Sequence, residues 1–106
     1  MSDENLSPEE KRARAIALLE ATHQFPVRYE LSVITVSTPE AFSAVRAAVQ
    51  AAFTGDATLG DDDHQMVPSK GGKYTSHRFR VPCAAPEDVL ALYERLRAAE
   101  GVMTLL

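Results

Sequence analysis

Two stretches of the chain alternate apolar and polar residues, which is the pattern of a strand with one buried face. The first stretch runs from Val27 to Val36, and the second runs from Tyr74 to Cys83. Phe79 and Val81 share one face of the second stretch, and their size predicts that this face is turned to the core. Both stretches are therefore expected to be the main strands of a sheet.

Three segments combine a helix start signal with apolar residues at helical spacing. The first helix is expected from about Pro8 to Ala21, where Ser7 caps the helix and Glu10 completes a capping box. The second is expected to start at Pro39 and to stop at Gly55, and the third to start at Pro86 and to stop at Glu100-Gly101. Only the second and third carry a strong apolar stripe, so the first is interpreted as an accessory element.

Two short strands complete the pattern, at about His64 to Val67 and from Val102 to Leu106. The first of them follows a polar, acidic stretch from Asp56 to Asp63, which is interpreted as a loop. Its end is marked by Pro68, which lacks a backbone donor and therefore favours an edge strand. Gly71-Gly72 then predicts a two-residue hairpin turn, because glycine adopts the positive φ angles that such a turn requires.

Without the first helix, the order is strand, helix, strand, strand, helix, strand, which favours an α+β, ferredoxin-like βαββαβ sandwich. This fold is a four-stranded antiparallel sheet with two helices on one face, and right-handed crossovers place its first and third strands in the centre. We expect an acidic segment and the accessory helix over residues 1–24, and the ferredoxin-like domain over residues 25–106. The open sheet face would carry Arg28, Glu30, Ser32, Ser76, Arg78 and Arg80.

Composition narrows the class of protein. A chain of 106 residues that is 45% hydrophobic is long enough for one core. Its net charge of -4 argues against general electrostatic binding to nucleic acid or anionic membrane. Cys83 is the single cysteine, so no internal disulfide forms, and no apolar run has the length of a membrane span or a signal peptide. A cytoplasmic protein is the expected result.

Several motifs resemble the YbeD-like family of small bacterial proteins. The residues that carry the resemblance are Phe25-Pro26, Pro68-Ser69-Lys70-Gly71-Gly72-Lys73-Tyr74, Ser76, Tyr93, Leu96, Gly101-Val102 and Leu105. The resemblance covers about Phe25 to Leu106, and it implies a ferredoxin-like fold similar to the ACT regulatory domains. It also implies a regulatory role, sometimes linked with lipoate metabolism, without an established activity. The N-terminal helix and the run Asp61-Asp62-Asp63 depart from the short members of the family.

The hairpin is the candidate binding site, because it brings basic side chains to an exposed tip next to glycine backbone donors. A ligand or partner would be held by Lys70, Gly71, Gly72, Lys73, Tyr74 and Arg78. The alternative is a soluble hairpin whose lysines only discourage association at the sheet edge.

Catalytic and metal sites are not expected. Asp61-Asp62-Asp63-His64 offers metal-type ligands, but consecutive residues rarely converge on one ion. His77 and Cys83 lie six residues apart on one strand, about 20 Å from end to end, so they cannot act as a base and nucleophile pair. No cofactor is expected either, because the glycine-rich segment joins two strands rather than a strand and a helix.

Counting outward from a two-residue turn gives the register of the hairpin. It places Asp63 opposite Arg80, where the two charges would pair, and Gln65 opposite Arg78. The same count places His64 and Met66 on the face of His77 and Phe79, so a partly buried histidine is expected there.

The function expected from these observations is a small, non-enzymatic regulatory or interaction domain. It would bind an unknown protein or a small anionic metabolite through the basic hairpin or a homodimer seam. The last strand is the better dimer edge, unless the N-terminal helix covers it. The alternative function is an RNA-binding module on the open sheet face, but nucleic acid is disfavoured because Tyr74 is the only aromatic residue expected there.

Overall fold

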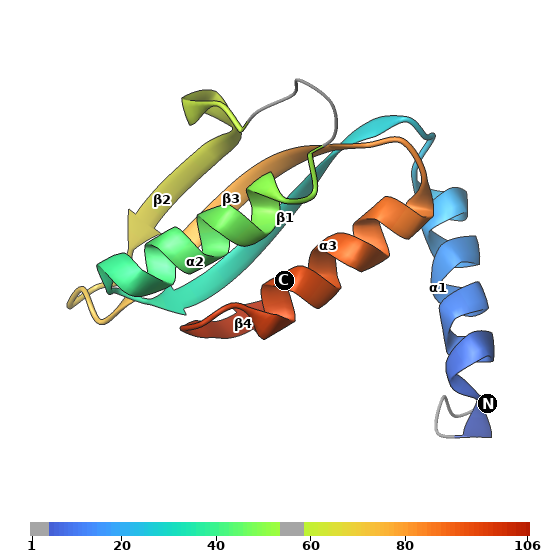
Figure 1. The fold of residues 1–106 in the computed structure, drawn as a ribbon, viewed down its shortest axis with the longest axis horizontal. Coiled ribbons are helices and arrows are strands. Elements are labelled where there is room, and N and C mark those ends of the chain that lie inside the picture. Colours follow the sequence, from blue (N-terminus) through green and yellow to red (C-terminus); the bar gives the residue numbers. More distant parts are fainter. Residues whose placement is uncertain (1–4, 54–58) are drawn as a thin grey trace.

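The computed structural model describes residues 5–53 and 59–106, and Figure 1 shows their arrangement. In chain order the elements are α1 (Pro8–Thr22), β1 (Val27–Val36), α2 (Pro39–Gln50), the 3-10 helix η2 (Asp61–Asp63), β2 (His64–Pro68), β3 (Tyr74–Cys83), α3 (Pro86–Ala98) and β4 (Val102–Leu105). The strand bounds expected for the two main strands are those of β1 and β3. The acidic stretch differs from the expected loop, because its last three residues form η2.

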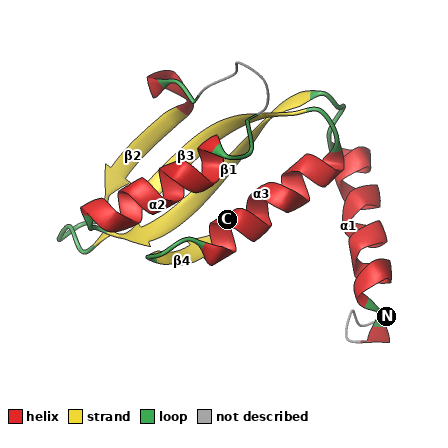
Figure 2. Ribbon diagram, viewed as in Figure 1, coloured by secondary structure: helices red, strands yellow, loops and turns green. Residues whose placement is uncertain are grey.

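The strands form one sheet in the order β2-β3-β1-β4, and every neighbouring pair is antiparallel. The two longest strands pair over their whole length, from Val27 opposite Cys83 to Val36 opposite Tyr74. Helices α2 and α3 cover one face of this sheet, whereas no helix of the described residues lies over the other face (Figure 2). The fold is therefore the expected α+β, ferredoxin-like arrangement with an additional N-terminal helix.

The core lies between the sheet and the helices α2 and α3. Alternate residues of β1 and β3 are buried, and both helices turn an apolar stripe toward them. The fully buried apolar side chains are Val33, Val45, Val49, Phe79, Val81, Val89, Leu92 and Leu96. Burial of each such side chain contributes roughly 1.5–3 kcal/mol, so the face of β3 that carries Phe79 is fixed to the core by its apolar residues.

Helix α2 ends earlier than the sequence pattern indicates. Its last residue is Gln50, and Phe53 is half-buried just beyond the helix. Gly55, the expected stop, lies outside the described residues. At the start of the helix, the Ala41 N–H donates to Thr38 Oγ1 over 3.1 Å, as a helix cap requires.

Helix α1 is attached only loosely. It contains no buried residue, and it packs against α3 at the end of the molecule where α3 begins (Figure 1). β4 lies at the other end of α3, so α1 does not cover the edge of the sheet. The capping box between Ser7 and Glu10 is present as expected. Among the helices of the described residues, none is long and apolar enough to cross a membrane.

Candidate functional site

The hairpin between β2 and β3 has the predicted register but a longer loop. The register runs from His64 opposite Phe79 to Pro68 opposite Thr75. The Ser69 N–H then donates to the Tyr74 carbonyl over 2.8 Å, and the Gly72 N–H donates to the Ser69 carbonyl over 2.9 Å. The predicted two-residue turn is therefore wrong, because Ser69 and Tyr74 close a loop of four residues. The register is still as predicted, because the two-residue turn and the four-residue loop have the same centre.

Both glycines of this loop adopt positive φ angles, 110° at Gly71 and 76° at Gly72. These angles are easily reached only by glycine, which explains the two adjacent glycines at the tip. A Cβ built on either residue would meet nothing within 4 Å. The tip is therefore surrounded by open space in which a partner can approach the backbone.

The two hairpin lysines are exposed, and neither forms an ion pair with the described residues. Lys73 Nζ lies 5.5 Å from the centre of the Tyr74 ring, within the range of a cation–π contact. The Tyr74 N–H donates to Ser69 Oγ over 3.1 Å, which ties the strand to the loop. The loop thus holds two unpaired positive charges next to a half-buried aromatic ring.

Arg78, the remaining candidate residue, is not part of the hairpin tip. It lies four residues after Tyr74 on β3, a separation of about 13 Å along an extended strand. Side chains two residues apart share one face of a sheet, so Tyr74, Ser76 and Arg78 all face away from the helices. The predicted site is therefore an elongated surface that runs from the tip along the open sheet face.

Ion pairs on the open face differ from the expected ones. Arg80 Nε lies 3.2 Å from Glu30 Oε1, directly across the β1–β3 pair, and Arg28 Nη1 lies 2.9 Å from Asp63 Oδ1. The predicted pair of Asp63 with Arg80 is wrong, because Asp63 belongs to η2 rather than to β2 and Glu30 is the direct neighbour of Arg80. Both observed pairs are at the surface, where such pairs contribute about 0–1 kcal/mol.

Arg78 differs from these two arginines. Its neighbours across the sheet are Ser32 on β1 and Gln65 on β2, both uncharged. No carboxylate of the described residues forms an ion pair with it. Arg78 therefore presents an exposed guanidinium that is free to pair with an acidic ligand.

A chain of hydrogen bonds under β2 was not predicted from the sequence. Thr35 Oγ1 lies 2.8 Å from His77 Nε2, and His77 Nδ1 lies 2.8 Å from His64 Nε2. His64 Nδ1 lies 2.9 Å from Arg46 Nη1, which comes from α2. The His64 ring also stacks on Phe79 with the ring centres 4.2 Å apart. The shared face of His64 and His77 was expected, but their direct contact and the arginine were not.

Burial keeps both histidines neutral. It lowers the pKa of His64 from 6.5 to about 4, and the charges of His77 and Arg46 act in the same direction. It also lowers the pKa of His77, whose side chain is fully buried. All four ring nitrogens of the two imidazoles are engaged in hydrogen bonds within the protein.

Cys83 is buried at the far end of β3. Burial, followed by the charge of Asp88, raises the pKa of its thiol to about 11. The reactive thiolate is therefore scarce at neutral pH. The described residues also contain no group of three or more His, Cys, Asp and Glu side chains placed to hold a metal ion.

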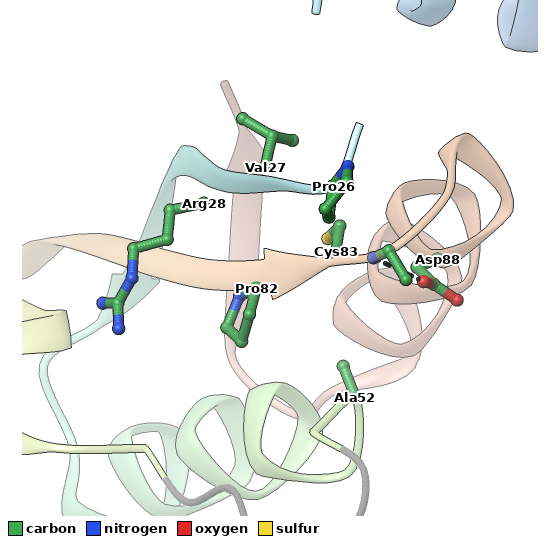
Figure 3. A pocket seen from close by; sticks show the side chains of 8 residues that line it. Pro26, Val27, Arg28, Ala52, Pro82, Cys83 and Asp88 are labelled. Atoms are coloured by element: carbon green, nitrogen blue, oxygen red, sulfur yellow. Dashed lines mark hydrogen bonds between the residues drawn. The ribbon is translucent and has the colours of Figure 1, made fainter. Parts of the chain in front are cut away.

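A cavity of about 430 Å³ lies beside Cys83 (Figure 3). Cys83 is at the opposite end of β3 from Tyr74, so the cavity is remote from the hairpin. It is lined by Pro26, Val27, Arg28, Ala52, Pro82, Cys83, Ala84 and Asp88. Asp88 Oδ2 accepts hydrogen bonds from the Ala84 and Ala85 N–H groups over 2.9 and 3.2 Å. Since Arg28 pairs with Asp63, both charged groups of the lining are already engaged within the protein.

These features define a small α+β domain with an exposed sheet face, a basic hairpin and a buried histidine pair. The chain belongs to the family described as a protein of unknown function, DUF493, whose model matches residues 20–106. The match includes the whole sheet, α2 and α3, and only the last turn of α1. No curated protein matches the chain.

Proposed function

We propose that this protein is a non-enzymatic interaction domain that binds an acidic segment of a partner protein along the hairpin tip and the open sheet face. The observation that carries the proposal is the distribution of free charge. On this surface Lys70, Lys73 and Arg78 form no ion pair with the described residues, whereas Glu30 and Asp63 are already paired with arginines. Asp62 lines the same hollow as Arg78, so the three free positive charges of this surface still outnumber the free carboxylate beside them.

The length of this surface favours a protein segment over a small metabolite. Arg78 lies five residues from Lys73, about 17 Å along the strand. An extended peptide of about five residues spans that distance, because each residue of an extended chain covers roughly 3.3 Å. An anionic metabolite is smaller, so it would contact either the tip or Arg78.

A regulatory role for this binding is the second part of the proposal. It is supported by the resemblance of residues 25–106 to YbeD-like proteins and to ACT domains, in which a ferredoxin-like unit has a regulatory rather than a catalytic function. We place this role in the cytoplasm, as the composition predicts. The partner's activity would then be controlled by whether its acidic segment is bound.

RNA binding is a weaker alternative. The open face carries Tyr74 as its aromatic residue among those described on β1 and β3, and bases need exposed rings for stacking. Two of the arginines there are already in ion pairs. The surface therefore lacks a stacking platform.

The experiment compares the wild type with Lys70→Glu/Lys73→Glu in binding to a fluorescent ten-residue acidic peptide, measured by anisotropy. We expect the affinity to fall at least about tenfold, because two charge-assisted contacts become repulsive. The matched control is Lys11→Glu/Arg12→Glu on α1, which has the same change in net charge at exposed positions and is expected to bind normally. Equal binding by all three proteins contradicts the proposal.

Two further ligands distinguish the alternatives in the same assay. Citrate competing at millimolar concentration and with the same dependence on Lys70 and Lys73 would favour a metabolite site. A single-stranded RNA that binds more tightly than the peptide, with a steep salt dependence, would favour the RNA-binding module.

A further inference from the structure

Strand β2 is joined to the core by one side chain. His64 is the only residue of β2 that is even half-buried, and the other four side chains, from Gln65 to Pro68, are exposed. The strand has one neighbour in the sheet, β3, so its other edge is open. Apart from its pairing with β3, the attachment of β2 therefore depends on the contacts of His64.

The contacts of His64 fix the position of every proton in the chain of hydrogen bonds. Arg46 only donates, so His64 Nδ1 must accept and the proton of this imidazole is on Nε2. His64 Nε2 then donates to His77 Nδ1, and His77 Nε2 carries the proton that is donated to Thr35 Oγ1. One arrangement of protons satisfies all three bonds, and it requires both imidazoles to be neutral.

An added proton has no place in this arrangement. On His64 it would point Nδ1–H at the Arg46 guanidinium and set two positive charges against each other. On His77 it would point Nδ1–H at the Nε2–H of His64. In either case a hydrogen bond is replaced by a contact between two donors in a partly buried place, which costs free energy.

The same arginine also holds the chain before β2. Arg46 Nη2 donates to the Leu59 carbonyl over 3.2 Å, and the Leu59 N–H donates to Gln50 Oε1 over 2.8 Å. Leu59 itself is buried. A shift of Arg46 away from a charged His64 would therefore loosen the entry into η2 and β2 together.

We propose that the hydrogen-bonded chain Arg46–His64–His77–Thr35 is a proton-sensitive latch, which on protonation releases β2 from the sheet while the rest of the fold stays intact. Release exposes the backbone of β3 as a new sheet edge, which another strand can pair with. The latch lies on the opposite face of β2 and β3 from Arg78, and it does not rest on the proposed peptide binding. Release of β2 would, however, also open the hairpin that carries Lys70 and Lys73.

The charged and titratable groups around the latch also disfavour protonation of the two imidazoles. Helix α2 contributes Arg46, β3 contributes His77, and β1 contributes the neutral Thr35. Asp63, next to His64 in sequence, is paired with Arg28 on the other face of the sheet. Within the described residues, no carboxylate is hydrogen-bonded to either imidazole, so no negative charge there favours the protonated form.

The lowered pKa values show in which direction pH changes the equilibrium between the latched and the released state of β2. The released state of His64 takes up a proton near pH 6.5, whereas the latched state does so at about 4. Between these pH values the released state binds more protons, so the latched state is fully stabilised above pH 6.5 and loses stability as the pH falls toward 4. From pH 7.5 to pH 4.5 the equilibrium constant for release should rise on the order of 50-fold for one proton.

The experiment measures amide hydrogen exchange of the full chain by NMR at pH 7.5 and pH 4.5, with protection corrected for the intrinsic exchange rate. In the wild type we expect the protection of the β2 amides to fall on the order of 50-fold, while amides in the β1–β4 pair keep theirs. The proposal is overturned if β2 and β1 lose protection by the same factor, or if β2 loses none. This measurement needs no variant.

His64→Gln tests the role of the proton. Glutamine supplies an acceptor for Arg46 and a donor for His77 but does not titrate, so the acid-induced loss at β2 should fall to less than about threefold. His23→Gln is the matched control, because His23 lies outside the latch and contacts Phe25 and Tyr29. A variant His64→Gln that shows the same acid-induced loss as the wild type would exclude the latch.

Discussion

Gly101 shows how one residue sets the distance between a helix and a strand. It lies between α3 and β4 with a φ of 82°, and its carbonyl accepts a hydrogen bond from the Val36 N–H over 3.0 Å. A Cβ built on it would lie 2.5 Å from the Cβ of Ala41, a contact too short for real side chains. Glycine is therefore required there both by the backbone angle and by the close approach of α2.

The substitution Gly101→Ala is expected to lower the free energy of unfolding by about 2–5 kcal/mol, because backbone strain and overpacking act together. The control is Gly72→Ala, which has a similar φ of 76° but open space around its Cβ. It should lose only about 1–2 kcal/mol. Urea denaturation measures both values, and equal losses would mean that the contact with Ala41 has no energetic effect.

The buried chain of hydrogen bonds marks the limit of prediction at this scale. Alternation along the hairpin placed His64 and His77 on one face, since register follows from counting. Arg46 is 18 residues earlier in the chain, and its approach to His64 depends on how α2 packs over the sheet. The local pattern of apolar and polar residues gives no information on such a contact, so the site predicted from the sequence did not include Arg46.

Helix caps show how differently the helices are coupled to the core. Ser7 caps α1 and Thr38 caps α2 with the same kind of hydrogen bond, 3.2 and 3.1 Å long. Helix α2 buries Ala41, Val45 and Val49, whereas α1 buries nothing. Loss of the two caps should therefore have different consequences for the whole protein.

Thr38→Ala is expected to lower the global free energy of unfolding by about 1 kcal/mol, the usual value of such a cap. Ser7→Ala should reduce amide protection within α1 and change the global value by less than about 0.5 kcal/mol, because α1 can fray alone. Urea titration gives the global values, and hydrogen exchange gives the local ones. A large global loss in Ser7→Ala would show that α1 is part of the cooperative unit.

At the scale of elements the sequence predicted most of the fold. Alternation defined β1 and β3 because each has one buried and one open face, and proline with a capping residue defined the starts of α1 and α2. The predictions that were wrong concern features that depend on tertiary contacts rather than on the local sequence. η2 turns Asp63 toward Arg28 rather than toward Arg80, and the hairpin loop has four residues rather than two.

At the scale of the whole molecule, the place of α1 could not be predicted. Its apolar residues do not gather into a stripe that specifies a partner, and it packs on the end of the α3 layer with Leu19 against the core. The consequence is that β4 remains an open edge (Figure 1). β4 carries exposed Met103 and no charged residue, whereas the other edge strand is followed by Lys70 and contains Pro68.

We propose that this edge is a homodimer seam, at which β4 of one copy pairs antiparallel with β4 of a second copy. Light scattering over a range of concentrations should then show a monomer–dimer equilibrium. Met103→Lys should weaken it at least about tenfold, because a charge on an exposed edge opposes pairing. The control Met66→Lys places the same charge at a similarly exposed methionine, 52% against 55%, on the opposite edge strand. If both variants dimerise equally the seam lies elsewhere, and if the wild type is monomeric throughout, the open edge of β4 is tolerated because the strand has only four residues.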